Sequence, residues 1–164
     1  MTVHPIEPVF NESSRILILG SFPSVKSREV MFYYGHPQNR FWKVLSKIFR
    51  SDVPQTVQDK KEFLLGHGIA LWDVIKSCEI TGSSDSSVKN VTANDISYIF
   101  EQAHIEKVYV NGRCAQKYYD KYIYPSNGIK CFALPSTSPA NAAYSLERLC
   151  DEWSVIREAL RVEI

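Results

Sequence analysis

The chain has 164 residues, of which 45% are hydrophobic, and its formal net charge at pH 7 is +1. This size and apolar fraction suffice for a sizeable core, so we expect one domain spanning residues 1–164. No run of about 18 apolar residues occurs, and the first ten residues lack the basic and apolar regions of a signal peptide. We therefore expect a soluble cytoplasmic protein, nucleoid-associated if the source is prokaryotic, that does not bind membranes.

The cysteines and histidines are dispersed along the chain. No cysteine belongs to a CxxC pair or neighbours a histidine at the spacing of metal ligands. We expect reduced, mostly buried thiols and neither a metal nor a cofactor. The cysteines are Cys78, Cys114, Cys131 and Cys150.

Basic residues gather in the first third of the chain. Residues 1–50 hold seven Lys/Arg against three Asp/Glu, whereas residues 51–164 hold twelve against fifteen. A modest basic face of this kind suits a protein that grips phosphates, although a solvated helix face explains the charge equally well.

The first predicted elements surround a Gly/Ser/Pro loop. Residues 1–14 resemble an extended lead-in, and the apolar run Ile16–Leu19 predicts a buried parallel strand. The loop Gly20–Ser24 follows. A helix comes next, with Pro37 expected in its first turn. Its apolar stripe is Phe41, Val44, Leu45, Ile48 and Phe49.

The middle of the chain predicts a helix, a strand, a loop and a further helix. Near-capping-box spacing starts the first helix near Thr56, and Gly66 or Gly68 ends it. The second buried strand is 69–74, and the Ser- and Gly-rich stretch 78–90 predicts a long loop. Thr92 and Asp95 are expected to open the next helix.

The last third repeats the alternation of strand and helix. Strands are predicted at 107–110 and 130–134, and helices at 113–124 and 145–162. Four buried strands that alternate with helices predict a three-layer α/β/α sandwich with a central four-stranded parallel sheet.

In such a fold all four strand exits meet at one edge, where open α/β sheets bind ligands. The exits are 20–24, 72–76, 111–113 and 135–141, and Trp72, Asp73 and Asn111 stand at strand ends. Ser and Gly backbone N–H groups at helix starts can hold phosphate. Either loop alone is more typical of a tight connection, so the combination carries the argument.

Three motifs in order support a specific interpretation. GSFPS follows the first strand, YGHPQNRFWKV opens the next helix, and PSTSPAN follows the last strand. Together they resemble the uracil-DNA glycosylase superfamily, and most of all its hypoxanthine-DNA (deoxyinosine) glycosylase branch. The likeness runs from about Arg15 to the last helix.

The resemblance implies a monofunctional DNA glycosylase of base excision repair, acting as a monomer on DNA that contains a damaged base. One nucleotide is flipped into a pocket and its N-glycosidic bond is hydrolysed. Asn39 is the catalytic candidate, because its amide could hold water in line with C1′; the alternative role is a helix N-cap. Tyr34 would stack on the base, although its neighbour Tyr33 could take this part.

The remaining implied roles follow motif by motif. The base-binding candidates are Gly20, Ser21, Phe22, Pro23, Ser24, Tyr34, Trp72 and Asn111. The DNA-binding candidates are Arg40, Arg113, Ser136, Thr137, Ser138, Pro139, Ala140 and Asn141.

Two departures bear on the substrate. Many uracil-directed relatives carry Asp or Asn where this chain has Phe22, and His where it has Leu134. These departures argue against an ordinary uracil enzyme. A uracil or G·T/G·U mismatch glycosylase is the first alternative, and a non-catalytic nucleotide-binding α/β module is the second. The absence of GxGxxG and of a P-loop motif argues against dinucleotide or NTP binding.

Overall fold

A computed structural model describes residues 1–161. Its centre is a four-stranded parallel sheet with the strand order β3-β2-β6-β7. The predicted fold class is confirmed, and each predicted strand differs from the observed one by a single residue at one end. The strands are β2 (Ile16–Gly20), β3 (Ile69–Asp73), β6 (Lys107–Asn111) and β7 (Cys131–Leu134).

Side chains of β2 alternate between two hydrophobic cores, one on each face of the sheet. Ile16 and Ile18 join the first core, whereas Leu17 and Leu19 join the second. All four are fully buried. This is why the strand reads as a continuous apolar run, since helices cover both faces of a parallel sheet.

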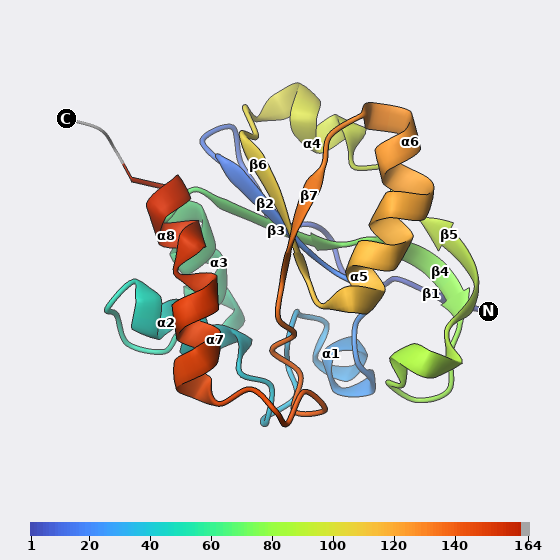
Figure 1. Ribbon diagram of the computed structural model, residues 1–164, viewed down its shortest axis with the longest axis horizontal. Coiled ribbons are helices and arrows are strands. Elements are labelled where there is room, and N and C mark those ends of the chain that lie inside the picture. Colours follow the sequence, from blue (N-terminus) through green and yellow to red (C-terminus); the bar gives the residue numbers. More distant parts are fainter. Residues whose placement is uncertain (162–164) are drawn as a thin grey trace.

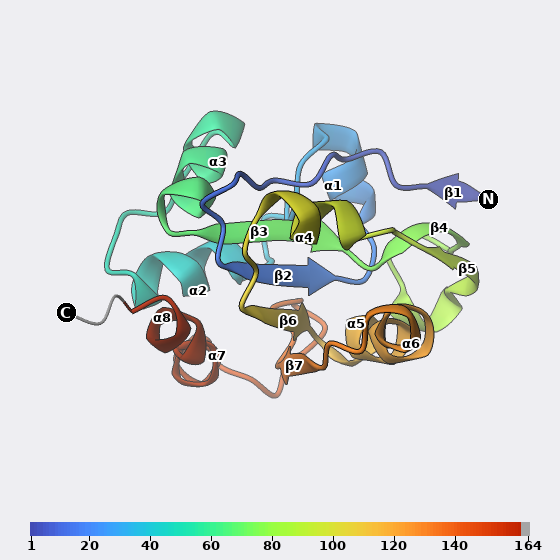
Figure 2. The ribbon, with the colours of Figure 1, turned by 90° about the horizontal axis from the view of Figure 1, so that it is seen from above.

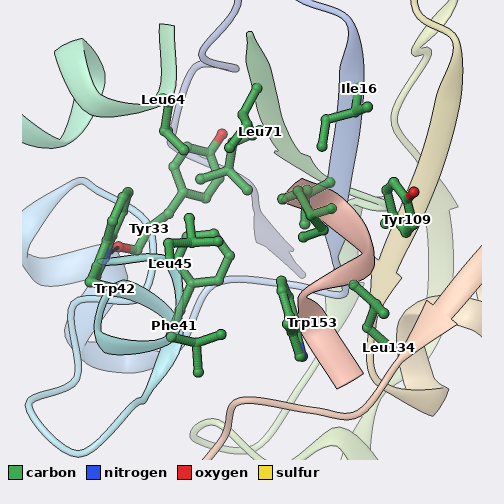
Figure 3. Packing of buried hydrophobic residues seen from close by; sticks show 14 of the residues in the cluster. Ile16, Tyr33, Phe41, Trp42, Leu45, Leu64, Leu71, Tyr109, Leu134 and Trp153 are labelled. Carbon is green, nitrogen blue, oxygen red and sulfur yellow. Dashed lines mark hydrogen bonds between the residues drawn. The ribbon is translucent and has the colours of Figure 1, made fainter. Parts of the chain in front are cut away.

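Helices form the two outer layers (Figure 1). The first core is closed by side chains from α2 (Phe41–Ile48), α3 (Val57–Gly66), α7 (Leu146–Trp153) and α8 (Val155–Ala159). The second is closed by α4 (Ser97–Gln102), α5 (Arg113–Tyr118) and the π-helical η2 (Tyr119–Ile123). In the first core Phe41 packs edge-on against Trp153, with ring centroids 5.8 Å apart (Figure 3).

A second, antiparallel sheet lies beyond the carboxyl end of the edge strand β3 (Figure 2). Its order is β1-β4-β5, from β1 (Thr2–Val3), β4 (Ile75–Glu79) and β5 (Lys89–Ala93). The 3-10 turn η1 (Asp85–Ser87) lies in the β4–β5 connection. The expectations of a lead-in at 1–14 and a loop at 78–90 were therefore wrong in part. These strands are short, carry Ser and charged residues, and pair with shifts in register, so their apolar alternation is weak.

Smaller differences concern the helices. The structure adds α1 (Val25–Val30), which the sequence did not predict. Thr92 lies in β5 rather than at a helix start, although Asp95 does accept a hydrogen bond from the backbone N–H of Ser97. Pro37 lies in the turn before α2, whose N-cap is Arg40.

Other helix boundaries follow the prediction more closely. Thr56 caps α3 through its side chain, as expected, and the helix ends at Gly66. The predicted helix 113–124 continues through α6 (Tyr124–Asn127). The predicted last helix is divided into α7 and α8, and its predicted end, Val162, lies outside the described residues.

The four cysteines are free thiols, but only Cys78 is buried; the other three are half-buried, contrary to the expectation of mostly buried thiols. Within residues 1–161 no helix combines the length and the apolar character needed to cross a lipid bilayer.

Candidate active site

The carboxyl ends of the parallel strands open into one cavity of about 350 Å³. The loop after β2, the segment before α2 and the loop after β7 all line it. The structure thus brings the loop after β7 to two segments that lie in the first quarter of the chain. The predicted residues that line the cavity are Gly20, Ser21, Phe22, Pro23, Ser24, Tyr34, Asn39, Asn111, Ser136, Thr137, Ser138, Pro139 and Ala140.

Four of the predicted residues do not line the cavity. Trp72 packs edge-on against Tyr98 on the outer side of β3, with ring centroids 5.8 Å apart. Arg113 is exposed at the start of α5. Asn141 donates from Nδ2 to the Ser136 carbonyl at 3.0 Å, so its side chain braces the loop after β7.

The fourth, Arg40, binds backbone carbonyls of the same loop. Its guanidinium donates to the carbonyl oxygens of Ser138 at 2.8 Å and Asn141 at 3.0 Å. It also donates to the carbonyls of Thr137 and Tyr144. A charged donor shared among four carbonyls fixes the loop, because each bond to a charged group is stronger than a neutral one. Arg40 therefore holds the loop after β7 in its conformation, whereas the sequence analysis expected Arg40 to bind DNA.

Asn39 belongs to a hydrogen-bond network that links two of the three segments. Its Oδ1 accepts from the backbone N–H of Phe41 and from the Thr137 hydroxyl, each at 2.9 Å. The hydrogen bond from the Phe41 N–H shows which end of the Asn39 amide is the oxygen, because a backbone N–H donor needs an acceptor. Both lone pairs of Oδ1 are engaged, which leaves the Nδ2 amino group of Asn39 as its free donor. Asn111 completes the network: it donates from Nδ2 to Thr137 Oγ1 and accepts from the Thr137 N–H.

Tyr34 is the aromatic side chain of the cavity that has a free hydroxyl. Its ring stacks on Phe41, with centroids 4.0 Å apart and 18° between the planes. The backbone of Tyr34 is in the left-handed region, at φ 52°. Among the described residues the buried hydroxyl has no hydrogen-bond partner. Burial, and next the charge of Asp73, raise the pKa of Tyr34, so the group is a neutral donor. Its neighbour Tyr33 instead donates to the Glu7 carbonyl at 2.8 Å.

Asp73, at the end of β3, lies on the floor of the cavity and is 3% exposed. Gly20 makes room for it: a Cβ at position 20 would lie 2.4 Å from Asp73 Oδ1 and 2.8 Å from the Tyr34 hydroxyl. Asp73 Oδ2 meets His4 Nε2 at 2.8 Å, whereas no hydrogen bond to Oδ1 is found within residues 1–161. The floor therefore presents an unpaired acceptor next to an unpaired donor.

The sequence analysis placed Asp73 at a strand end beside the expected pocket but gave it no role, and it did not select His4. Its position at the end of a strand did not distinguish Asp73 from Trp72, which does not line the cavity. His4 stands in a segment with no recognisable motif, so nothing in the sequence indicates its position.

A second carboxyl group, Asp85, stands at the rim of the cavity. The Ser21 hydroxyl donates to its Oδ1 at 3.3 Å. Partial shielding from water raises the pKa of Asp85, and the bond from Ser21 works in the opposite direction. No lysine is among the described residues that line the cavity. Within residues 1–161 no group of three or more His, Cys, Asp or Glu side chains could hold a metal ion.

Comparison with known proteins gives a consistent result. The profile of the uracil DNA glycosylase superfamily matches residues 7–161. The chain is 35% identical over 150 residues to a hypoxanthine DNA glycosylase from Methanosarcina acetivorans, covering 90% of this chain and 93% of the relative. A hypoxanthine DNA glycosylase from Methanosarcina barkeri is 35% identical over 136 residues, covering 82% and 85%.

A solved structure agrees over nearly the full length. The solution NMR structure of a candidate uracil DNA glycosylase from Methanosarcina acetivorans superposes with a TM-score of 0.82 at 31% sequence identity. The superposition covers 98% of this chain and 100% of that one.

Proposed function

The chain belongs to the uracil DNA glycosylase superfamily, and we propose that hypoxanthine, the base formed when adenine is deaminated, is the base that this DNA glycosylase releases from DNA. The reaction is hydrolysis of the bond between the base N9 and the deoxyribose C1′. The base must leave the duplex to reach the cavity.

The observation that carries the proposal is the buried Tyr34 hydroxyl, which has no hydrogen-bond partner among the described residues, beside Asp73 Oδ1, for which no partner is found either. A buried polar group without a partner is costly, so it indicates that a ligand completes the bonding. Tyr34 offers its hydroxyl there, and the backbone N–H groups of Ser21 and Phe22 have no acceptor among the described residues.

This arrangement matches the edge that deamination creates. Hypoxanthine presents a ring N1–H donor beside the O6 acceptor. Adenine presents the reverse pattern, an acceptor N1 beside an amino donor. The carboxylate of Asp73 accepts N1–H, and the donors of the 20–24 loop meet O6. Adenine would place its N1 lone pair against a carboxylate, so the undamaged base is rejected.

The same contacts favour bond cleavage. As the bond to C1′ breaks, the departing base gains negative charge that spreads onto O6, where the loop donors stabilise it. Asn39 holds the attacking water through its free Nδ2 donor, because its Oδ1 is occupied by Phe41 and Thr137. An amide N–H cannot take a proton from that water, so Asn39 orients the water, and the proton released after attack neutralises the departing base anion. An oxocarbenium-like transition state needs little help from the nucleophile.

The loop after β7 is the proposed contact with DNA on either side of the flipped nucleotide. Ser136 and Ser138 line the cavity with Pro139 and Ala140, and hydroxyl and backbone N–H groups are common phosphate ligands. Thr137 is fully buried, and its hydroxyl and N–H are bonded to Asn39 and Asn111, so it supports the loop instead. Arg40 fixes the conformation of this loop by binding its backbone carbonyls. Because no described cavity residue is a lysine, the protein is proposed to act without an amine nucleophile, as a monofunctional glycosylase.

We propose that the active species is a monomer folded as one domain, since both cores pack against the same sheet. Sedimentation at assay concentration checks this; a stable dimer would contradict it.

Release of hypoxanthine is tested with duplex oligonucleotides that carry one deoxyinosine, one deoxyuridine or one G·T mismatch. After incubation, alkali cleaves abasic sites. The expected result is cleavage of the deoxyinosine strand that depends on enzyme and alkali, and its loss in Asn39→Ala. Strand cleavage without alkali would contradict monofunctional action.

Uracil is the second candidate, because its N3–H and O4 form the same donor and acceptor pair. Turnover of deoxyuridine with none of deoxyinosine would move the function to that base. Equal affinity for damaged and undamaged DNA without any base release would instead indicate a non-catalytic nucleotide-binding module.

A further inference from the structure

The amino-terminal segment lies along the outer edge of β3 and is anchored on both sides of His4. Before it, β1 pairs with β4, and the His4 N–H donates to the Lys76 carbonyl at 2.7 Å. After it, Val9 exchanges two backbone hydrogen bonds with Leu71, at 2.9 and 2.8 Å. Ile6 is buried in the first core. The segment is therefore a fixed part of the fold that holds His4 in place.

The His4 side chain is enclosed by the rings of Phe22, Tyr33 and Trp72. It is 3% exposed, and its ring meets Phe22 edge-on with centroids 5.9 Å apart. The backbone N–H of Ile6 donates to its Nδ1 at 3.2 Å. Nδ1 is therefore the unprotonated nitrogen and Nε2 carries the ring proton. Nε2–H then donates to Asp73 Oδ2 at 2.8 Å.

Among the described residues, no other side chain donates a hydrogen bond to the Asp73 carboxyl group. The Tyr33 hydroxyl is committed to the Glu7 carbonyl, and the Asn94 amide donates to the backbone carbonyls of Asp73 and Ile75. Asp85 and Tyr34, the other ionisable groups facing Asp73, are an acid and a phenol without positive charge. His4 is the residue that hydrogen-bonds to the Asp73 carboxyl group within residues 1–161.

We propose that His4 is a positioning residue for base recognition: its Nε2–H occupies Asp73 Oδ2, so that Oδ1 is presented to the cavity as an obligatory acceptor for the ring N–H of a deaminated base. This inference rests on the proposed function. A carboxyl group without that partner could rotate, and Oδ1 would then no longer be held toward the cavity. His4 thereby ties the amino-terminal segment to substrate choice.

The test compares two substrates and three proteins under single-turnover conditions. Deoxyinosine carries N1–H, and deoxynebularine is the same purine without N1–H and O6. The wild-type enzyme is expected to favour deoxyinosine by about 100-fold or more, because a site built for a hydrogen bond rejects an analogue that lacks it. In His4→Phe, which keeps an aromatic ring but no donor, this preference is expected to narrow by about 10-fold through loss of rate on deoxyinosine.

His4→Gln is the rescue variant, since its amide nitrogen can replace the imidazole Nε2–H. It is expected to restore most of the preference. His104→Phe is the matched control, because His104 is exposed and is not among the residues that line the cavity. Thermal unfolding of each variant separates a folding defect from a change in recognition.

A purely structural role of His4 would slow both substrates equally, and an unchanged ratio in His4→Phe would overturn the proposal. Failure of the proposed function looks different: the wild type itself would release no hypoxanthine. If uracil proves to be the substrate, the same comparison is made between deoxyuridine and deoxycytidine, since uracil alone carries the ring N–H.

Discussion

The two sheets contribute to one cavity in different ways. The parallel sheet ends in Gly20, Asp73 and Asn111, whose positions follow from buried strands with regular pairing. The antiparallel sheet supplies His4, next to β1, and Asp85, from the β4–β5 connection. Groups from the first sheet face the cavity directly, whereas His4 acts on a group that does. The parallel sheet thus sets the positions of the groups that face the cavity, and the short antiparallel sheet places the hydrogen-bond donor to one of them, Asp73.

Loss of the carboxyl group at the parallel sheet's edge is expected to have the largest effect. Asp73→Ala should slow hypoxanthine release by about 1000-fold, because the ring N–H loses its acceptor and buried donors stay unpaired. Single-turnover assays on deoxyinosine DNA measure this. A folded variant that loses less than about 10-fold would show that Asp73 does not contact the base.

Crowding the same edge should be the next most harmful change. In Gly20→Ala the new Cβ would lie 2.4 Å from Asp73 Oδ1, so the carboxyl group must move. A shift of this kind is expected to cost about 100-fold in rate. Gly66→Ala is the control, because a Cβ there meets no atom within 4 Å. Equal rates for the two variants would mean that the floor of the cavity tolerates displacement.

Arg40 tests the link between the parallel sheet and the loop after β7. Arg40→Ala leaves several carbonyls without their charged donor and should lower the free energy of unfolding by about 2 kcal/mol. Arg40→Lys should recover little of this, since one ammonium cannot serve four carbonyls. Urea denaturation measures the change. Lys43→Ala, an exposed position on α2, serves as the control.

The smallest effect is expected from the antiparallel sheet. The raised pKa of Asp85 means that the native state binds its proton more tightly than the unfolded state, so stability falls as pH rises above the ordinary value of 3.8. Asp85→Asn carries no charge and should be slightly more stable than wild type at neutral pH, with the difference vanishing below pH 3.8. Thermal unfolding at several pH values checks the sign. Lower stability of the variant at neutral pH would contradict it.

The sequence predicts the parallel sheet well because strands buried on both faces must be apolar throughout, as in Ile16–Leu19. Convergence of the three loops then follows from the topology. The antiparallel strand β4 contains Lys76, Ser77 and Glu79, and backbone pairing rather than side-chain pattern forms it. This is why the sequence suggested a loop instead.

Contacts over long sequence separations explain the rest of the differences at the site. His4 and Asp73 are 69 residues apart, and their meeting depends on the path of the amino-terminal segment. Arg40 reads as a basic residue suited to phosphate, but its four carbonyl partners become apparent only when the loop after β7 is in place. A sequence motif identifies such a residue without telling whether it serves the substrate or the fold.

The adjacency of Asn39 and Arg40 has a thermodynamic consequence for catalysis. Both residues are bonded to the loop after β7, one through the Thr137 hydroxyl and the other through main-chain carbonyls. The amide proposed to hold water and the loop proposed to contact DNA are therefore joined by hydrogen bonds within the protein itself. Under the proposed function, binding of DNA would not have to form these contacts, since the structure already contains them, and the free energy of binding could be used to extrude the nucleotide.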